Sequence, residues 1–221
     1  MTVLRIHASQ LGERWDVGFH TGPAISIPDP ALPLSHVVDI RRGHSVSAKE
    51  YVGPETQRKV VPYIRISDLA KHTISKDSIK QIIDSENIPE TARTNTGDVL
   101  FSIAGTIGKT AIVTPSFHRA VASSQIAILT PKDDHVYPEF LVRILEAKYV
   151  KSQLLRAQTG SFIRHLPLNE LKRIRISVPS KEDQATIIQK MRDLETELEK
   201  SKEAQDKIKT ELDSILGGHA Y

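Results

Sequence analysis

The chain has 221 residues, of which 39% are hydrophobic and 26% charged, so it can bury a core and is not a disordered chain. It contains no cysteine, which excludes disulfide bridges, thiolate zinc sites and a cysteine nucleophile. Residues 1–180 hold 23 Lys and Arg against 17 Asp and Glu, and residues 181–221 hold 7 against 10, so a basic body precedes an acidic tail. A basic body suits a phosphate backbone, although an ordinary solvated surface can carry the same charge.

No apolar run reaches the roughly 18 residues that a membrane-spanning helix needs. The first residues also lack the apolar core of a secretory signal. We therefore expect a soluble, cytoplasmic protein that does not contact a membrane.

Short β-like segments follow the proline-rich stretch 27–33, and each is bounded by turn residues. The predicted strands cover residues 62–67, 99–103, 110–113 and 125–129. One helix is expected to interrupt them, with Pro138 in its first turn and an apolar face formed by Leu141, Ile144, Leu145, Leu154 and Leu155.

Residues 173–178 alternate strictly between basic or polar and apolar side chains. This pattern predicts a strand in which Ile174, Ile176 and Val178 face the core while Arg173 and Arg175 point away. Together these elements predict an α+β protein: a β-rich domain with a few helices over residues 1–178, and a long C-terminal helix over residues 179–221.

The tail has the clearest periodicity. Ser180 with Asp183 three residues later resembles a capping box, and the helical pattern runs to about Leu216 before two glycines. Apolar residues recur there in steps of four and three, which is typical of a coiled-coil seam. The seam consists of Ile187, Met191, Leu194, Leu198, Ser201, Gln205, Ile208, Leu212 and Ile215. The alternative is a single amphipathic helix that lies on its own domain.

Two catalytic motifs are incomplete. Gly105 to Thr110 resembles the end of a phosphate-binding loop, but Ile103 stands where the first glycine is required, so we predict a glycine-rich hairpin instead. Glu139, Glu146 and Lys148 resemble a nuclease core, yet two carboxylates two turns apart on one helix are a poor metal site. The histidines show no paired metal-ligand spacing. We therefore predict neither catalytic residues nor a metal site.

Polar and basic residues gather in the predicted loops of the β-rich body. Such residues supply the hydrogen-bond donors and acceptors that DNA phosphates and base edges require. The candidate DNA-binding residues are Arg41, Arg42, His44, Tyr63, Arg65, Thr106, Lys109, Ser161, Arg164 and His165. Of these, we expect Thr106, Ser161, Arg164 and His165 to contact base edges, and the arginines 41 and 42 and Lys109 to contact phosphates.

The order of these motifs resembles one half of the DNA specificity (S) subunit of type I restriction-modification systems. The resemblance covers about residues 34–216. It rests on segments 34–43, 61–68 and 97–113, on Gly160-Ser161 with His165-Leu166, and on segment 176–184 before the long helix. The chain departs from the family in having one proline, Pro179, at the helix entry, and in having one recognition domain and one spacer helix where a full member has two of each. It is expected to be either a natural half-subunit or a truncated longer one.

The resemblance implies a non-catalytic chain that binds double-stranded DNA and directs adenine-N6 methyltransferase subunits to a bipartite site. A restriction translocase is a further implied partner. S-adenosylmethionine, ATP and magnesium are expected on those partner subunits and not on this chain. Two alternatives stay open: a metal-dependent nuclease or nucleotide hydrolase, and a coiled-coil scaffold that does not bind DNA.

An antiparallel homodimer is the expected use of the seam. With the two-fold axis at Ser201, Ile187 pairs with Ile215, and Leu198 with Gln205, so polar residues occupy only the central layers. A parallel pair would stack Ser201 on Ser201 and Gln205 on Gln205. Two identical recognition domains at opposite ends of a rod imply a palindromic, interrupted DNA site.

Overall fold

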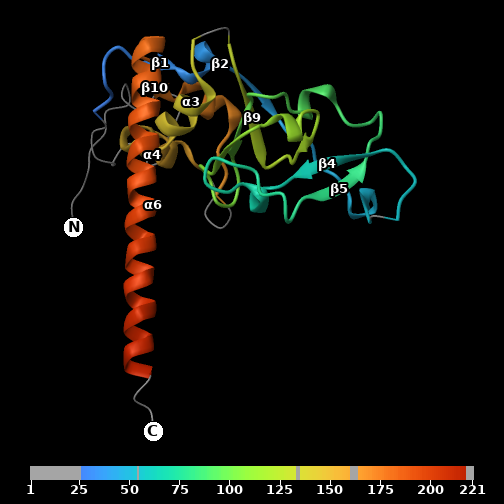
Figure 1. Ribbon diagram of the computed structural model, residues 1–221. Coiled ribbons are helices and arrows are strands. Elements are labelled where there is room, and N and C mark those ends of the chain that lie inside the picture. Colours follow the sequence, from blue (N-terminus) through green and yellow to red (C-terminus); the bar gives the residue numbers. More distant parts are fainter. Residues whose placement is uncertain (1–25, 54, 133–134, 160–163, 218–221) are drawn as a thin grey trace, which may run out of the picture. The chain divides into compact units, whose positions relative to one another are not determined.

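The computed structural model describes residues 26–53, 55–132, 135–159 and 164–217, with the backbone alone at 48 and 212–217 (Figure 1). The chain forms two compact units, Met1–Val178 and Pro179–Tyr221. The first is rich in strands and the second is a long helix, so the predicted α+β class is confirmed. Among the described helices, none combines the length and apolar character that a bilayer crossing requires.

The strands of the first unit form three sheets, in the orders β1-β10, β2-β9-β6-β7 and β3-β5-β4-β8. All pairs are antiparallel except β4 and β8, which run parallel. The strands are β1 (Leu32–Pro33), β2 (Val38–Arg42), β3 (Tyr51–Val52), β4 (Val60–Ile64), β5 (Lys80–Ile83), β6 (Val99–Ser102), β7 (Thr110–Ile112), β8 (Val121–Ala122), β9 (Ile126–Pro131) and β10 (Arg175–Ile176).

Five α-helices accompany the sheets among the described residues. They are α2 (Leu34–Val37), α3 (Pro138–Leu145), α4 (Lys148–Ala157), α5 (Leu168–Arg173) and α6 (Lys181–Gly217). Short 3₁₀ turns cover Ala48–Glu50, Ile66–Asp68, Glu90–Ala92 and Pro115–Phe117.

The two four-stranded sheets share one core. Ile64 of β4, Leu100 of β6 and Ile128 of β9 belong to the same cluster of buried side chains. Strand β6 is buried along its whole length, because α3 packs against β6 and β7 on one face while the shared core covers the other. Removing a large apolar side chain from water contributes roughly 1.5–3 kcal/mol, so this core stabilises the sheet that carries the loops described below.

The four strands expected at 62–67, 99–103, 110–113 and 125–129 are present as β4, β6, β7 and β9, with ends that coincide or differ by up to three residues. The single helix expected after Pro138 is wrong. It is two helices, because Ala147 adopts an extended conformation (φ −58°, ψ 141°) between α3 and α4.

The strand expected over residues 173–178 is also shorter than predicted. Arg173 ends helix α5, which the sequence did not indicate, and only Arg175 and Ile176 form a strand. The predicted facing is nevertheless confirmed for Ile174 and Ile176, which are buried, and for Arg173 and Arg175, which are exposed.

Helix α6 begins as its sequence predicts. The Ser180 hydroxyl accepts a hydrogen bond from the Asp183 backbone N–H (3.1 Å) and donates one to the Asp183 carboxylate (2.8 Å). The Gln184 side-chain amide donates to the Pro179 carbonyl (2.9 Å). The Ser180 hydroxyl thus satisfies a backbone N–H at the helix start that has no partner within the helix itself.

Candidate nucleic-acid interface

Several strands of the first unit end side by side. Strand β2 ends at Arg42 opposite Ala127, and β6 ends at Ser102 opposite Ile126, where β9 begins. The parallel strands β4 and β8 end together at Ile64 and Ala122. The loops that follow these ends, together with residues 164–165, form one polar surface, which we call the loop edge: residues 42–45, 65–68, 103–109, 123–125 and 164–165.

Gly43 lets two of these loops approach each other. Its backbone N–H donates to the Ile126 carbonyl (3.0 Å), and the His44 N–H donates to the Ala122 carbonyl (2.8 Å). A Cβ atom at Gly43 would lie 2.1 Å from the Ser123 carbonyl oxygen, so only glycine fits this position. The glycine thus brings Arg42 and His44 beside the turn at Ser123.

The turn between β8 and β9 is held from three sides. The Ile126 N–H donates to the Ser123 carbonyl (2.9 Å), Arg42 Nε donates to the Ser124 carbonyl (2.8 Å), and the Ser45 hydroxyl donates to Ser124 Oγ (2.6 Å). Gln125 is exposed in this turn. Ser45, Ser124 and Gln125 were not identified from the sequence as candidate residues of this surface. Only the polar residues directly before the predicted strand at 125 pointed to this turn.

The glycine-rich hairpin between β6 and β7 is present as predicted. Ser102 Oγ, which is buried, accepts from the Lys109 N–H (2.8 Å) and donates to the Thr106 carbonyl (2.6 Å). Gly105 and Gly108 have φ values of +63° and +94°, which favour glycine. The hairpin therefore holds Thr106 exposed, and Lys109 Nζ lies 3.5 Å from the Ile66 carbonyl.

His165 lies against the same hairpin. It forms isolated β-bridges with Ala104 and Thr159, and the Leu166 N–H donates to the Ile103 carbonyl (2.8 Å). Arg164 beside it is exposed. Ser161, the remaining candidate of this loop, lies outside the described residues.

Tyr63 and Arg65 support the loop edge more than they form its surface. The Tyr63 side chain is buried, its hydroxyl donates to the His44 carbonyl (3.0 Å), and burial raises the pKa of the phenol to about 12. Arg65 donates from Nε and Nη2 to Asp68 (3.1 and 2.8 Å). Burial opposes ionisation of Asp68, but hydrogen bonds from Arg65 and Ser78 outweigh it and lower the pKa of that carboxyl.

Arg41 is partly buried, with 22% of its side chain exposed. Its guanidinium donates to the Asp98 carboxylate (2.9 Å), Thr130 Oγ1 (3.0 Å) and the carbonyls of Thr91 and Arg93 (3.2 and 3.0 Å). The Asp98 side chain is 1% exposed and also accepts from Thr130 Oγ1 (2.6 Å) and the Asn95 N–H (2.8 Å). The structure thus gives Arg41 a structural position and separates it from exposed Arg42.

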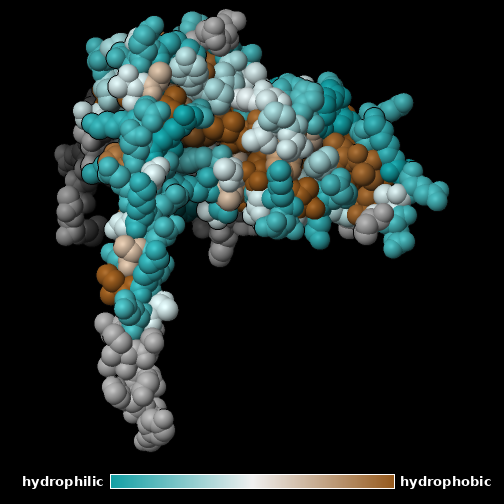
Figure 2. All heavy atoms as spheres, in the orientation of Figure 1, coloured by the Kyte–Doolittle hydropathy of each residue, from teal (hydrophilic) through white to brown (hydrophobic). Residues whose placement is uncertain are grey.

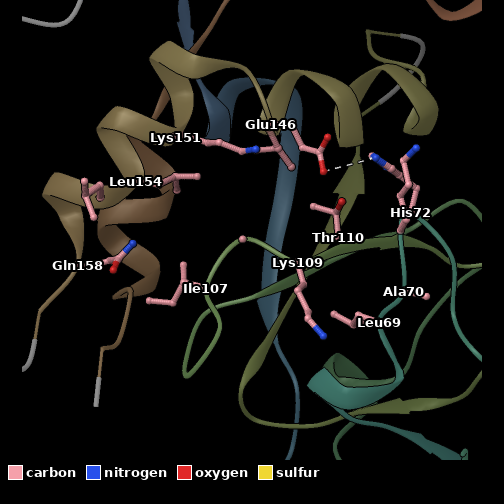
Figure 3. Close-up of a pocket in the computed structure, with 14 residues that line it drawn as sticks. Leu69, Ala70, His72, Ile107, Lys109, Thr110, Glu146, Lys151, Leu154 and Gln158 are labelled. Atoms are coloured by element: carbon pink, nitrogen blue, oxygen red, sulfur yellow. Dashed lines mark ion pairs between the residues drawn. The ribbon is translucent and has the colours of Figure 1, made fainter. Parts of the chain in front are cut away.

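A pocket of about 720 Å³ lies on the other side of the hairpin (Figure 3). It brings together Lys109, Thr110 and Glu146, which belong to the two incomplete catalytic motifs. Glu146 Oε1 lies 3.5 Å from His72 Nε2, and Glu146 is the one carboxylate that lines the pocket. In the part of the chain that the structure describes, no three His, Asp or Glu side chains gather as metal ligands do. The lining of the pocket thus combines three lysines with a single carboxylate.

Comparison with known proteins gives one family and several similar folds. The family model described as the type I restriction modification DNA specificity domain matches residues 32–209. No sequence among the curated proteins is similar enough to count as a match.

Three solved structures illustrate the similarity of fold. The first structure comes from work on complex assembly and conformational transition of the type I R-M system. It superposes on this chain with a TM-score of 0.65 at 20% sequence identity, and the match covers 87% of this chain and 45% of that one. The HsdS subunit from Thermoanaerobacter tengcongensis gives 0.63 at 20% identity over 87% and 44%. The S subunit from M. genitalium gives 0.53 at 13% identity over 79% and 42%. The matched part of this chain thus covers less than half the length of each of these proteins.

Proposed function

We propose, from the premise that this chain belongs to the type I restriction-modification DNA specificity family, that its strand-rich unit reads double-stranded DNA and directs partner methyltransferase subunits to the site. The observation that carries the proposal is the loop edge, where four strand ends place Arg42, His44, Thr106, Gln125 and His165 on one polar surface. Cations there can hold phosphates, while amide, hydroxyl and imidazole groups can bond base edges.

The catalysts in this proposal are the partners. Adenine-N6 methyltransferase subunits would bring S-adenosylmethionine, and a restriction translocase would bring ATP and magnesium, in a cytoplasmic complex. This chain contributes recognition in the proposal, and the lining of its pocket carries one carboxylate beside several cations.

Helix α6 supplies the surface for assembly. Figure 2 shows that its described part is mostly hydrophilic, with isolated apolar side chains. Five apolar seam residues are exposed, from 37% for Met191 to 63% for Ile208. They are Ile187, Met191, Leu194, Leu198 and Ile208. Such a stripe on a charged helix supports pairing with a second helix. The side chains of Leu212 and Ile215 lie outside the described residues.

The proposal is tested by purifying the chain with a methyltransferase subunit encoded beside it and mapping methylated adenines in DNA exposed to the complex. We expect methylation at a palindromic, interrupted site, and no methyl transfer by the chain alone. Methylation by the highly purified chain would contradict the adaptor role. Failure to bind any duplex, even with the methyltransferase present, would favour a DNA-independent scaffold, and magnesium-dependent nuclease or nucleotide hydrolase activity would favour an enzyme.

The antiparallel dimer is tested by cysteine crosslinking, for which the chain is convenient because it has no cysteine of its own. We expect Ile187→Cys protein mixed with Ile215→Cys protein to form a disulfide-linked pair, because the proposed register places these positions opposite each other. Ile187→Cys protein alone is the control and should remain uncrosslinked. Efficient self-crosslinking at 187 would indicate a parallel pair, and a monomer in sedimentation at micromolar concentration would assign the seam to methyltransferase helices.

A further inference from the structure

The hairpin at 103–109 stands between two flanks at the same end of the sheet. On one side lie the start of β9 and then Arg42 at the end of β2. On the other side, beyond β7, His72 forms a parallel bridge with Ala111 and accepts a hydrogen bond from the Ile112 N–H (3.0 Å). Because that bridge is parallel, Lys71 is level with Thr110, the first residue of β7.

Both flanks are cationic. Arg42 is exposed on the first flank. On the second flank Lys71 and Lys151 are exposed and line the pocket behind the hairpin. In Figure 3, Lys151 on α4 lies across the pocket from Ile107 and Thr110. The lining contains three lysines and a single carboxylate, Glu146, so it carries an excess of positive charge.

The two flanks are far enough apart to lie on either side of a duplex groove. Neighbouring strands lie about 4.8 Å apart, so four steps from β2 to the Lys71 segment span roughly 19 Å. The major groove of B-DNA is about 12 Å wide, with a phosphate strand on each side. A groove that receives the hairpin therefore has one strand over Arg42 and the other over the pocket.

We propose that the pocket binds phosphates of the second DNA strand, with Lys71 and Lys151 as the phosphate-binding residues. The inference rests on the proposed DNA-reading function and extends it from one side of the hairpin to both. These lysines position the duplex and do not select its sequence, because an ammonium group bonds phosphates of any sequence equally.

The test uses the full chain and a duplex selected by that chain from a random library. Binding is measured at several salt concentrations for the wild type, Lys71→Ala, Lys151→Ala and the double variant. We expect the slope of log K against log salt to fall by about 0.9 for each lysine removed, with the selected sequence unchanged. Both side chains are exposed, so the variants should fold as the wild type does.

Lys172→Ala is the matched control. Lys172 is also exposed, but it lies on α5 in a separate pocket with Pro33 and Ser35, near the start of β2 and thus at the opposite end from Arg42. Its removal should leave the slope unchanged.

Neutral methylphosphonate linkages, placed in one DNA strand at a time, show which DNA strand each cation contacts. They should weaken binding of the wild type when placed in either strand. The double lysine variant should become insensitive to them in one strand, and Arg42→Ala insensitive in the other. An unchanged slope of log K against log salt in the double variant, or an altered selected sequence, would contradict the assignment of the pocket as a phosphate-binding site. If the wild type selects no sequence even with the methyltransferase subunit present, the proposed function itself fails.

Discussion

Replacing Gly43 with alanine is expected to destabilise the first unit by about 3 kcal/mol or more and to abolish specific DNA binding. The added Cβ would lie 2.1 Å from the Ser123 carbonyl oxygen and 2.3 Å from that of Ala122, and both are backbone atoms that cannot rotate away. Relief requires separation of the 42–45 loop from the turn at Ser123, which breaks the hydrogen bonds from Gly43 and His44. Thermal unfolding should show a fall in Tm of roughly 6–12 °C.

Gly53→Ala is the matched control for this measurement. A Cβ at Gly53 meets no atom within 4 Å, so its stability should stay within about 0.5 kcal/mol of the wild type. If Gly43→Ala unfolds at the same temperature as the wild type, the two loops are not held together as described. The loop edge would then not be a fixed surface.

The strands could be predicted because their signals are local. Segments such as 99–102 and 126–131 are apolar runs between turn residues, and each is read without knowledge of its partner. The pairing of β4 with β8 could not be predicted in this way, because it joins Tyr63 to Val121 across a long stretch of chain. The loop edge depends on that pairing, so its composition emerges only in the folded unit.

The helical region at 138–157 shows a second limit of prediction from the sequence. Residues 138–155 carry apolar positions at helical spacing, and this pattern continues through the break at Ala147. No proline or glycine marks the break, so periodicity alone could not place it. The consequence is that α4 presents Lys151 to the pocket, and no local pattern marked that lysine as functional.

One signal in the sequence was available and decides between two candidates. Arg41 and Arg42 are adjacent in a strand, and adjacent side chains of a strand point to opposite faces. We therefore expect the exposed Arg42, and not the half-buried Arg41, to contact the DNA backbone from β2. Both arginines were chosen as DNA-contact candidates from their residue type alone. The alternation of side chains along a strand instead predicts that only one of them faces the surface.

Arg41→Ala and Arg42→Ala are accordingly expected to have different effects on stability and on DNA binding. Arg41→Ala leaves the carboxylate of Asp98 buried without its cation, so the first unit should lose about 3–5 kcal/mol of stability. Arg42→Ala removes one exposed hydrogen bond to the Ser124 carbonyl, so stability should change by about 1 kcal/mol or less. The salt slope of DNA binding should nevertheless fall by about 0.9 in Arg42→Ala, because a phosphate contact is lost.

Thermal unfolding and salt-dependent DNA binding of both variants separate these outcomes. Arg41→Lys sharpens the test, since a lysine restores the charge beside Asp98 but cannot reproduce the forked donors that also reach Thr130 and the carbonyls of Thr91 and Arg93. We expect it to recover only part of the lost stability. If Arg41→Ala instead folds like the wild type and lowers the salt slope as Arg42→Ala does, Arg41 is a DNA contact and its network with Asp98 opens when the duplex binds.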